Sequence, residues 1–446
     1  PSLLSAMRVL TDPAETGAVT IAMPQDVQAE VFDWPVELFR KRVWHVRRPV
    51  PEPAALERAV ALIKAAKRPL IIAGGGTIYA GASEELRALA TATGIPVGDT
   101  QAGKGAINFD HPSAVGGVGS TGCDSGNHIA DKADLIIGVG TRYSDFTTAS
   151  KTQFKNPDVK FVNINVTPFD AAKESAEMVV ADAREALAAL KEALADYRVE
   201  AAYSEEIAAE KEAWIKATER CYHLDHGPLP AQTEVFGALN ELMGEEDVVI
   251  NAAGSMPGDL QALWQARSPL QYHVEYAFSC MGYEVPAAMG VKLARPEAEV
   301  VAIVGDGTYQ MLPMELATVV QENIKVIYVL LQNYGFCSIG ALSESRGSQR
   351  FGTKYRQRGE GSHLADEQVI DGVDIAANAR SWGLDVLEVH TIAEFKEAYR
   401  QAEASDRPTM IHIETDLYGP NPPGSSWWDV PVSGVSELES TQRAYE

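Results

Sequence analysis

The sequence has little positive charge, few cysteines and no long apolar run. Only 38 lysine and arginine residues stand against 62 aspartate and glutamate residues, which gives a net charge of −24. A chain of that charge repels nucleic acid phosphates and anionic lipid, so we expect neither as a partner. No apolar stretch approaches the ~18 residues that a membrane-spanning helix needs, which excludes such a helix.

The four cysteines are too few and too scattered for a disulfide framework or a zinc site. Cys123, Cys221, Cys280 and Cys337 show no paired metal-ligand spacing. This usage is typical of a reducing compartment, and the N-terminus lacks the basic and apolar regions of a secretory signal, so we expect a cytoplasmic protein. Because the chain begins with Pro1 rather than methionine, we expect it to be part of a longer polypeptide.

The length and the order of the segments predict several domains of one class. At roughly 150 residues per domain, a chain of 446 residues corresponds to about three domains. Apolar strand-like segments alternate with helical segments through most of the chain, which is typical of parallel βαβ units. We therefore expect an α/β fold of stacked, doubly wound parallel-sheet domains.

The first half of the chain contains the clearest expected elements and a linker. We expect a helix that ends near Asp12, and three prolines between residues 49 and 53 predict a linker. A long region rich in alanine, glutamate and lysine, residues 171–218, is expected to be helical. The expected strands are residues 18–23, 69–73, 95–97, 134–139 and 159–166.

Three apolar strands in the second half each end in a short turn that contains glycine or asparagine. The strands are expected at residues 248–250, 300–304 and 325–331, and their turns at residues 251–255, 305–307 and 332–335. In an open parallel sheet, ligands bind at the carboxyl ends of the strands. We therefore expect the three turns to line one crevice.

The second of these turns carries an acidic residue between two glycines. Asp306 lies between Gly305 and Gly307, and Asn333 follows the next strand. A carboxylate, an amide oxygen and a backbone carbonyl are hard oxygen ligands of the kind that Mg²⁺ takes alongside phosphate. The glycines allow close approach of phosphate, and Thr308 begins a helix whose N-terminal amides favour anions. A purely structural turn is the alternative, because a single Gly-Asp-Gly after a strand is common.

Together with residues 276–290, these turns resemble the thiamine-diphosphate-dependent enzymes of the acetohydroxyacid synthase and pyruvate decarboxylase superfamily. The run from Gly305 to Asn333 is similar to their motif for the metal and the diphosphate. The resemblance implies thiamine diphosphate and Mg²⁺ as cofactors, with Asp306, the Asn333 side chain and the Gly335 carbonyl as metal ligands. Gln332 departs from the doubled asparagine often found there, but the ligand position is intact.

The same resemblance assigns the contacts to the cofactor. Residues 281–288 are similar to the segment that grips the aminopyrimidine, which would place Met281 as an apolar wedge beneath the bent cofactor. Backbone groups of Ser279 and Met281 are expected to meet the ring, and a buried core methionine is the alternative for Met281. The expected cofactor-binding residues are Gly254, Ser255, Ser279, Met281, Gly305, Gly307, Thr308, Gly335 and Phe336.

Three stretches, residues 275–285, 351–356 and 426–432, are similar to the trihydroxycyclohexane-dione hydrolase subfamily of inositol degradation. The implied reaction is hydrolysis of the ring C–C bond between adjacent carbonyls of a polyhydroxy cyclic diketone, to 5-deoxy-glucuronate. A homodimer or homotetramer is implied as well. The alternatives are an acetohydroxyacid synthase-like carboligase, another cyclic-diketone hydrolase, and a non-catalytic diphosphate-binding protein.

The superfamily also uses a glutamate from an N-terminal pyrimidine-binding domain to activate the cofactor. Only the first part of this chain resembles that domain, so we assign no residue to this glutamate and expect the chain alone to be inactive. The expected parts are a remnant of the pyrimidine-binding domain (1–48), a central α/β domain (49–195), a helical linker (196–224), a diphosphate- and Mg²⁺-binding α/β domain (225–417) and a C-terminal wrap (418–446).

Several other patterns have less specific interpretations. The glycines at 74–76 are read as structural, because the G-x-G-x-x-G pattern of a dinucleotide site is absent. The segments 116–119 and 140–143 lie where some superfamily members bind FAD, which we do not expect here. His223, Asp225 and His226 are expected in a polar linker rather than a metal site.

Two further groups of residues flank the expected metal turn in sequence. Cys280 and Cys337 are expected to be buried thiols without a catalytic role. A basic and aromatic cluster follows the turn, and it either receives an anionic substrate, closes a loop over the cofactor or is an exposed surface loop. Its members are Arg346, Arg350, Lys354, Tyr355 and Arg356.

Overall fold

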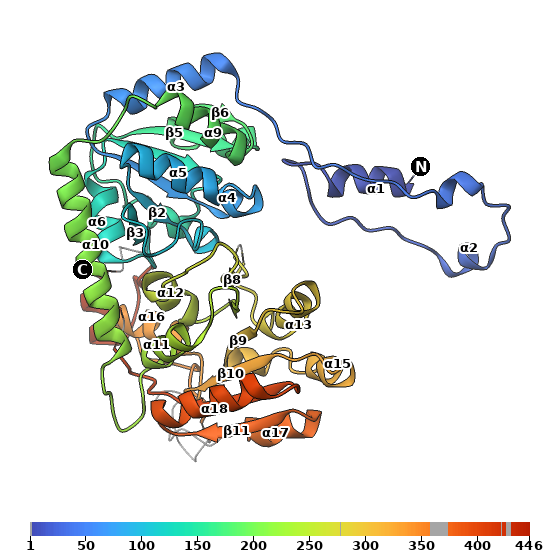
Figure 1. Ribbon diagram of the computed structural model, residues 1–446. Helices are drawn as coiled ribbons and strands as arrows, with labels where there is room; N and C mark the ends of the chain where they lie inside the picture. The colour runs from blue at the N-terminus through green and yellow to red at the C-terminus, as the bar shows by residue number, and fades with distance from the viewer. Residues whose placement is uncertain (1, 277, 357–372, 421, 425–429) are drawn as a thin grey trace.

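Two parallel β-sheets with helices around them make up most of the chain, and a long helix runs beside both (Figure 1). This computed structural model describes residues 2–276, 278–356, 373–420, 422–424 and 430–446. Every strand pair in both sheets is parallel. The expected α/β class with doubly wound parallel sheets is therefore confirmed.

The first sheet has the strand order β3-β2-β1-β4-β5-β6. The central strands β1 and β4 are buried along their whole length, which explains their continuous apolar sequence. The strands are β1 (Pro69–Ala73), β2 (Val97–Asp99), β3 (Ala114–Gly117), β4 (Leu135–Val139), β5 (Lys160–Asn165) and β6 (Glu177–Val180). Its helices are α3 (Pro53–Ala65), α4 (Gly75–Tyr79), α5 (Ser83–Thr93), η2 (Gln101–Gly103), α6 (Asp124–Lys132), α7 (Asp145–Thr148), α8 (Pro168–Ala171), η3 (Lys173–Ser175) and α9 (Ala183–Ala193).

The second sheet has the order β11-β12-β10-β9-β7-β8. Its strands are β7 (Val248–Asn251), β8 (Tyr272–Val274), β9 (Val300–Gly305), β10 (Ile327–Gln332), β11 (Asp385–Val389) and β12 (Thr409–Glu414). Its helices are α11 (Gln232–Leu242), α12 (Met256–Leu263), α13 (Glu284–Ala294), α14 (Asp306–Tyr309), α15 (Glu315–Gln321), α16 (Cys337–Ser345), α17 (Ile375–Trp382) and α18 (Ile392–Ala404).

Alternate side chains of β10 belong to two different hydrophobic cores. Ile327, Val329 and Leu331 pack with buried residues of α11, α12 and α18. Tyr328 and Leu330 pack with those of α13, α15 and α17. Because successive side chains of a strand point to opposite faces, the second sheet is covered on both sides, and its carboxyl edge is left for the turns.

The long helix α10 (Ala201–Tyr222) joins the two units. It packs against β3 and α6 of the first unit and against α11 and α12 of the second. Its buried residues include Tyr203 and Ile207 in the first core and Trp214 in the second. The helix is therefore part of both hydrophobic cores.

A buried polar network also connects the two units. Gln261 of α12 is 1% exposed, and its Nε2 donates to the backbone carbonyls of Asp99 and Val118, 3.3 Å from each. The hydroxyl of Thr121 donates to Gln261 Oε1. Gln101 Nε2 donates to the Pro257 carbonyl at 2.7 Å. The contact between the units is thus specified by hydrogen bonds as well as apolar packing.

We expect Gln261→Leu to lower the free energy of unfolding by about 1–3 kcal/mol, because it removes the acceptor of the Thr121 hydroxyl and a donor to the Asp99 and Val118 carbonyls within this contact. Equilibrium denaturation in urea measures this loss. The exposed Gln401 on α18 provides the control, for which Gln401→Leu is expected to change stability by less than about 0.5 kcal/mol. Equal effects of the two substitutions would contradict the expectation.

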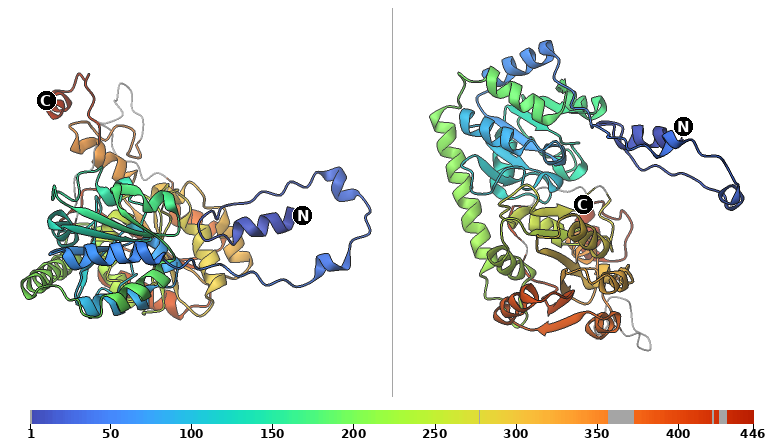
Figure 2. Two further views of the ribbon diagram at one scale, coloured as in Figure 1. Left: turned by 90° about the horizontal axis from the view of Figure 1, so that it is seen from above. Right: turned by 45° about the vertical axis from the view of Figure 1, so that its right-hand side comes forward.

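Residues 2–46 extend away from both sheets in every view (Figure 1; Figure 2). The expected N-terminal helix is present as α1 (Ser2–Leu10), and two short helices follow, α2 (Gln25–Ala29) and η1 (Val36–Phe39). The expectation of a strand at residues 18–23 is wrong. That segment is exposed and pairs with no strand in the described part of the chain, and an apolar segment becomes a β-strand only when a neighbour takes up its hydrogen bonds.

The expected helical region at residues 171–218 is also wrong in part. It contains β6, which pairs with β5, before α9 and α10 begin. Pairing with a formed sheet edge outweighs the helical propensity of the flanking sequence.

A C-terminal helix, α19 (Glu439–Tyr445), ends the chain. Among the described residues, no helix has the length and apolar character needed to span a membrane.

Candidate functional site

The three turns of the second half follow neighbouring strands, because β7, β9 and β10 are adjacent in the sheet. A Cβ atom added to Gly305 would lie 3.3 Å from the methyl of Met256, so the first and second turns touch. Asp306 bonds the backbone of residues after β10, so the second and third turns touch as well. The structure thus brings the three turns to one edge of the sheet, as expected.

Asp306 is buried at the centre of this edge, with 1% of its surface exposed. Its Oδ1 accepts from the Gly307 amide at 2.8 Å, and its Oδ2 accepts from the amides of Asn333 at 3.2 Å and Tyr334 at 2.6 Å. Burial raises the pKa of Asp306 to about 6, although these amide donors oppose the rise. A cation beside this carboxylate would offset the cost of burying its charge.

Asn333 and Gly335 present oxygen atoms next to Asp306. The Oδ1 atom of Asn333 is buried and has no hydrogen-bond partner among the residues that the structure describes. Tyr334, with φ of 59°, turns the chain between them. Gly335 pairs with Lys354 in an antiparallel bridge, and an added Cβ would lie 2.2 Å from the Thr353 carbonyl, so only glycine fits. An unpaired amide oxygen beside a buried carboxylate fits a hard divalent cation.

Close packing explains Gly307 in the second turn, and backbone conformation explains Gly254 in the first. A Cβ on Gly307 would lie 2.9 Å from the Phe336 ring, so the ring lies directly against this turn. Gly254 has φ of 87°, a left-handed conformation that favours glycine. In the same turn, the Ser255 hydroxyl donates to Gln232 Oε1 at 3.1 Å. This hydrogen bond therefore connects the turn that carries Gly254 and Ser255 to α11.

Asp259 supports this arrangement from the next turn of α12. Gln232 Nε2 donates to Asp259 Oδ2, which completes a chain from Asp259 through Gln232 to Ser255. Burial raises the pKa of Asp259 to about 7, and the bond from Gln232 opposes the rise. The sequence alone predicts no role for Gln232 or Asp259, because the two residues lie 27 positions apart on different helices.

The segment expected to meet the aminopyrimidine lies beside the second turn. Met281 and Ser279 are half-buried, and Ser279 has φ of 50°. The partial exposure of Met281 argues against the alternative of a core methionine. The Gly282 amide donates to the Thr308 hydroxyl at 2.7 Å, and this hydroxyl donates in turn to Glu284. The Thr308 hydroxyl is therefore committed within the protein, and a ligand would meet only its backbone.

Comparison with known proteins agrees with this geometry. Residues 56–190 match the family model for the central domain of thiamine pyrophosphate enzymes, and residues 252–413 match the model for their C-terminal TPP-binding domain. The chain belongs to the thiamine pyrophosphate enzymes. Thiamine pyrophosphate, the same compound as thiamine diphosphate, is their cofactor, and the three turns of the second sheet all lie within or beside the range of the TPP-binding domain.

Several known proteins share sequence with the whole chain. It is 44% identical over 469 residues to the 3D-(3,5/4)-trihydroxycyclohexane-1,2-dione hydrolase of Bacillus cereus strain AH820. It is 43% identical over 469 residues to the enzyme of that name from Bacillus anthracis strain A0248, and 44% over 471 residues to that of Bacillus thuringiensis strain Al Hakam. Each alignment covers 100% of this chain and 73% of the relative.

The glycines of the first unit have structural roles within this family member. A Cβ on Gly74 would lie 2.3 Å from the Gly140 carbonyl, which supports the structural interpretation of the glycines at 74–76. A Cβ on Gly116 would lie 2.5 Å from Cys123 Sγ, and one on Gly119 would lie 2.1 Å from the Phe146 carbonyl. These glycines allow close packing of the chain with itself.

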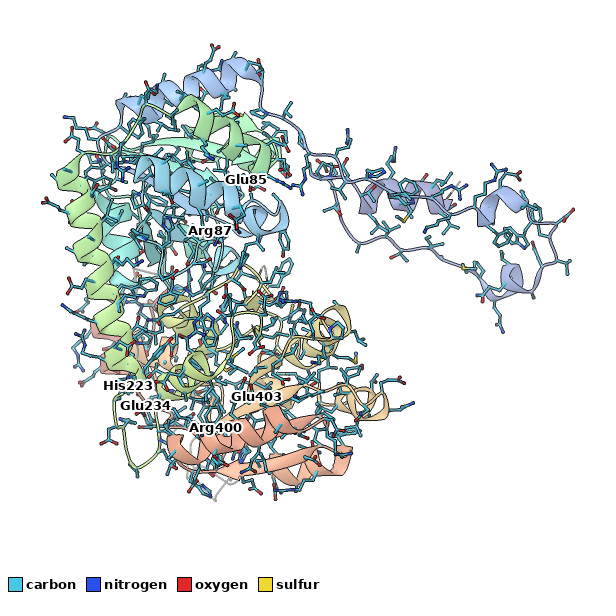
Figure 3. All side chains as sticks on the ribbon, viewed as in Figure 1. Glu85, Arg87, His223, Glu234, Arg400 and Glu403 are labelled. Atoms are coloured by element: carbon cyan, nitrogen blue, oxygen red, sulfur yellow. The ribbon has the colours of Figure 1, made fainter. Side chains whose placement is uncertain are left out.

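The histidines at the end of α10 pair with carboxylates. His223, labelled in Figure 3, lies 3.1 Å from Glu241, and His226 lies 2.8 Å from Asp416. The described residues contain no group of three or more histidine, cysteine, aspartate or glutamate residues that would hold a metal ion. Each histidine therefore has an ordinary polar partner, in keeping with a polar linker.

The expectation of buried thiols is wrong for Cys280, which is exposed in the turn before α13, as is the nearby Phe278. Cys337 is half-buried, and its Sγ lies 3.4 Å from the Leu417 carbonyl. Burial raises the pKa of Cys337, and the nearby Arg350 guanidinium opposes the rise. A cation thus lies beside this thiol without making it acidic.

Two members of the basic cluster hold the C-terminal segment. The Arg350 guanidinium lies 4.6 Å from the centre of the Tyr418 ring and bonds Glu344 at 2.8 Å, and Lys354 Nζ lies 5.5 Å from that ring. Tyr355 packs edge-on against Phe336, with ring centres 6.1 Å apart. Arg350 and Lys354 therefore have internal partners, whereas Tyr355 lies beside the metal turn.

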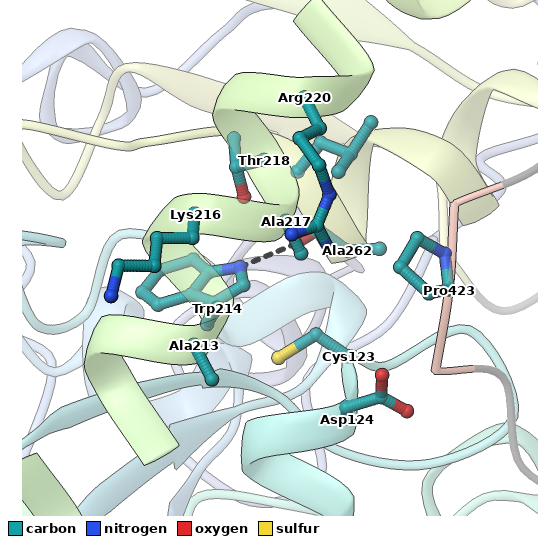
Figure 4. A pocket seen from close by; sticks show the side chains of 11 residues that line it. Cys123, Asp124, Ala213, Trp214, Lys216, Ala217, Thr218, Arg220, Ala262 and Pro423 are labelled. Atoms are coloured by element: carbon teal, nitrogen blue, oxygen red, sulfur yellow. Dashed lines mark hydrogen bonds between the residues drawn. The ribbon is translucent and has the colours of Figure 1, made fainter. Parts of the chain in front are cut away.

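Two cavities among the described residues lie apart from these turns. One, of about 250 Å³, lies between α10, the start of α6 and the end of α12, where Trp214 Nε1 donates to the Ala262 carbonyl at 2.8 Å (Figure 4). A second, also of about 250 Å³, lies beside β8 and is lined in part by Tyr272 and His273. Neither is lined by an expected cofactor or metal residue.

Proposed function

We propose that this thiamine pyrophosphate enzyme hydrolyses the ring C–C bond of 3D-(3,5/4)-trihydroxycyclohexane-1,2-dione to 5-deoxy-glucuronate in inositol degradation. The supporting observation is 43–44% identity, along the whole chain, to hydrolases of that name. The cofactor, when bound, supplies a carbanion that adds to a carbonyl and accepts the electrons of the broken bond. The protein positions the cofactor, delivers water and excludes side reactions.

We propose Mg²⁺ as the metal, held by Asp306, the Asn333 side chain and the Gly335 carbonyl. The unpaired Asn333 oxygen and the costly buried charge of Asp306 support this assignment. We also propose that the backbone or side chains of further residues bind the cofactor. These residues are Gly254, Ser255, Ser279, Met281, Gly305, Gly307, Thr308 and Phe336. For Ser255 and Thr308 these roles fall to the backbone, since both hydroxyls donate to protein acceptors.

The remaining parts of the proposal concern organisation. We propose the domain boundaries given above, a homodimer or homotetramer, and a cytoplasmic location. The two sheets and the helix α10 lie within the proposed ranges 49–195, 225–417 and 196–224 respectively.

A substrate assay with the full-length protein tests the function. With thiamine diphosphate and Mg²⁺, we expect ring opening of the cyclic dione and no acetolactate from pyruvate. Acetolactate formation would instead identify an acetohydroxyacid synthase-like carboligase. Absence of any thiamine diphosphate binding would contradict the entire proposal.

A further inference from the structure

Glu284 is a buried carboxylate to which the proposed chemistry gives no role. It lies in the first turn of α13, and none of its surface is exposed. A buried carboxylate is costly unless several donors bond it. Glu284 lies within residues 281–288, the segment expected to grip the aminopyrimidine, but its position inside an apolar stretch gave no indication of its contacts.

The donors to Glu284 come from all sides of the cofactor-facing edge. The Thr308 hydroxyl lies 3.1 Å and 3.3 Å from its two carboxylate oxygens. The backbone amides of Ala253, Gly282 and Glu284 itself face the carboxylate and favour its charged form. One carboxylate therefore bonds the turn after β9 through Thr308 and faces amides of the turn after β7 and of the turn before α13.

Thr308 extends this connection. Its hydroxyl donates to Glu284 and accepts from the Gly282 amide at 2.7 Å. A continuous chain of hydrogen bonds therefore runs from Gly282 through Thr308 to Glu284. Gly282 has φ of 89°, and an added Cβ would lie 2.8 Å from Leu312 Cβ. This close approach brings the Gly282 amide to the hydroxyl.

Each connected turn carries residues proposed to bind the cofactor. Gly254 and Ser255 follow Ala253, Met281 precedes Gly282, and the turn after β9 contains Asp306. Residues behind a binding site fix the geometry of the residues that touch the ligand, and their loss costs affinity without removing a contact.

We propose that Glu284 is a positioning residue that locks the three cofactor-facing turns together through the Thr308 hydroxyl and thereby preorganises the diphosphate and aminopyrimidine contacts. This inference rests on the proposed function, because it requires thiamine diphosphate at this edge. Glu284 touches neither the substrate nor the reacting atoms in this role, and it acts on affinity for the cofactor.

Four variants of the full-length protein test the proposal by calorimetric titration of thiamine diphosphate at saturating Mg²⁺. We expect Glu284→Gln and Thr308→Val to raise the dissociation constant roughly 10–100-fold, and Thr308→Ser to restore affinity because it keeps the hydroxyl. The double variant Glu284→Gln/Thr308→Val should lose little more than either single variant, because both break the same connection.

Glu315 and Thr318 provide a matched control, since they form a similar hydrogen bond at 3.3 Å on α15 but bond none of the three turns. Glu315→Gln should leave the dissociation constant of thiamine diphosphate unchanged.

In kinetic assays of Glu284→Gln and Thr308→Val, the apparent dissociation constant of the cofactor should change more than kcat. Thermal denaturation without cofactor checks folding, and Thr308→Val alone decides the question if Glu284→Gln does not fold.

Unchanged cofactor affinity in Thr308→Val or in folded Glu284→Gln would overturn the inference, as would loss of kcat with no change in affinity. A wild-type protein that binds no thiamine diphosphate would overturn both this inference and the proposed function. Carboligation of pyruvate would contradict only the proposed substrate, and the variant affinities would still test the role of Glu284.

Discussion

Replacing Asp306 by alanine is expected to weaken magnesium-dependent binding of thiamine diphosphate by roughly 100- to 4000-fold. Removing one partner of a buried charge pair costs about 3–5 kcal/mol, and each 1.4 kcal/mol is about tenfold in affinity. Calorimetric titration of thiamine diphosphate with Mg²⁺ into the wild-type and variant full-length proteins measures this loss.

The geometry explains why no neighbour would replace Asp306. Three amides already converge on its carboxylate, and they would oppose rather than attract a cation once it is gone. Asn333 Oδ1 would remain as a neutral ligand only. Asp385, an exposed residue of β11 paired with Arg407, provides the control, because exposed ion pairs contribute little. Asp385→Ala should bind the cofactor as the wild type does.

The pKa of Asp306 adds a second test of the same assignment. Because burial raises it to about 6, protons compete with Mg²⁺ at mildly acid pH. The apparent magnesium affinity should fall about tenfold per pH unit below pH 6 and level off above it. A flat profile across this range, or wild-type affinity in Asp306→Ala, would contradict the role of Asp306 as a metal ligand.

Replacing Asp259 by asparagine is expected to stabilise the protein above pH 7. The pKa of Asp259 rises from 3.8 to about 7 because burial disfavours its charged form. The folded state therefore holds a proton that the unfolded state has lost between about pH 4 and pH 7. Across this window the free energy of unfolding falls as pH rises, by at most about 4 kcal/mol from this group.

In the asparagine variant residue 259 does not titrate, so it does not lower the free energy of unfolding as pH rises. Its amide oxygen still accepts from Gln232. Urea denaturation of both proteins at pH 5 and pH 8 measures the effect as a difference between them, which cancels the titration of other groups. The stabilisation should be larger at pH 8 than at pH 5, by about 1–3 kcal/mol. Equal differences at the two pH values, or a destabilised variant at pH 8, would contradict this expectation.

The cost of Asp259 suggests why it is present. A charge that destabilises the fold is most often retained where a site needs it. Here the carboxylate orients Gln232, which fixes Ser255 in the turn proposed to face the diphosphate. The stabilised Asp259→Asn protein therefore offers a direct comparison between stability and cofactor binding.

Sequence patterns predicted those parts of the molecule that depend on local signals. β1, β4, β9 and β10 are continuous apolar runs bounded by turn residues, and the rule for parallel sheets brought Asp306 and Asn333 to one edge. The segment at 18–23 has the same local pattern, but pairing is not local, and it remains unpaired among the described residues. Likewise β6 depends on its neighbour β5 rather than on its own sequence.

The residues that hold the cofactor-facing turns in place could not be predicted from the sequence. Glu284 and Thr308 lie 24 residues apart, and only the fold shows that they bond. Gln232 and Asp259 meet because α11 and α12 cover the same face of the second sheet. A motif shows the residues that touch a ligand, whereas the residues behind them are fixed by packing between distant elements.

The helix α10 limits how the two α/β units move. At ~1.5 Å per residue, its 22 residues form a rod roughly 33 Å long. Since both units are anchored on this rod by buried side chains, one cannot rotate against the other without bending the helix or losing apolar contacts. Relative motion of the two units is therefore expected to be small, because α10 is packed on both of them.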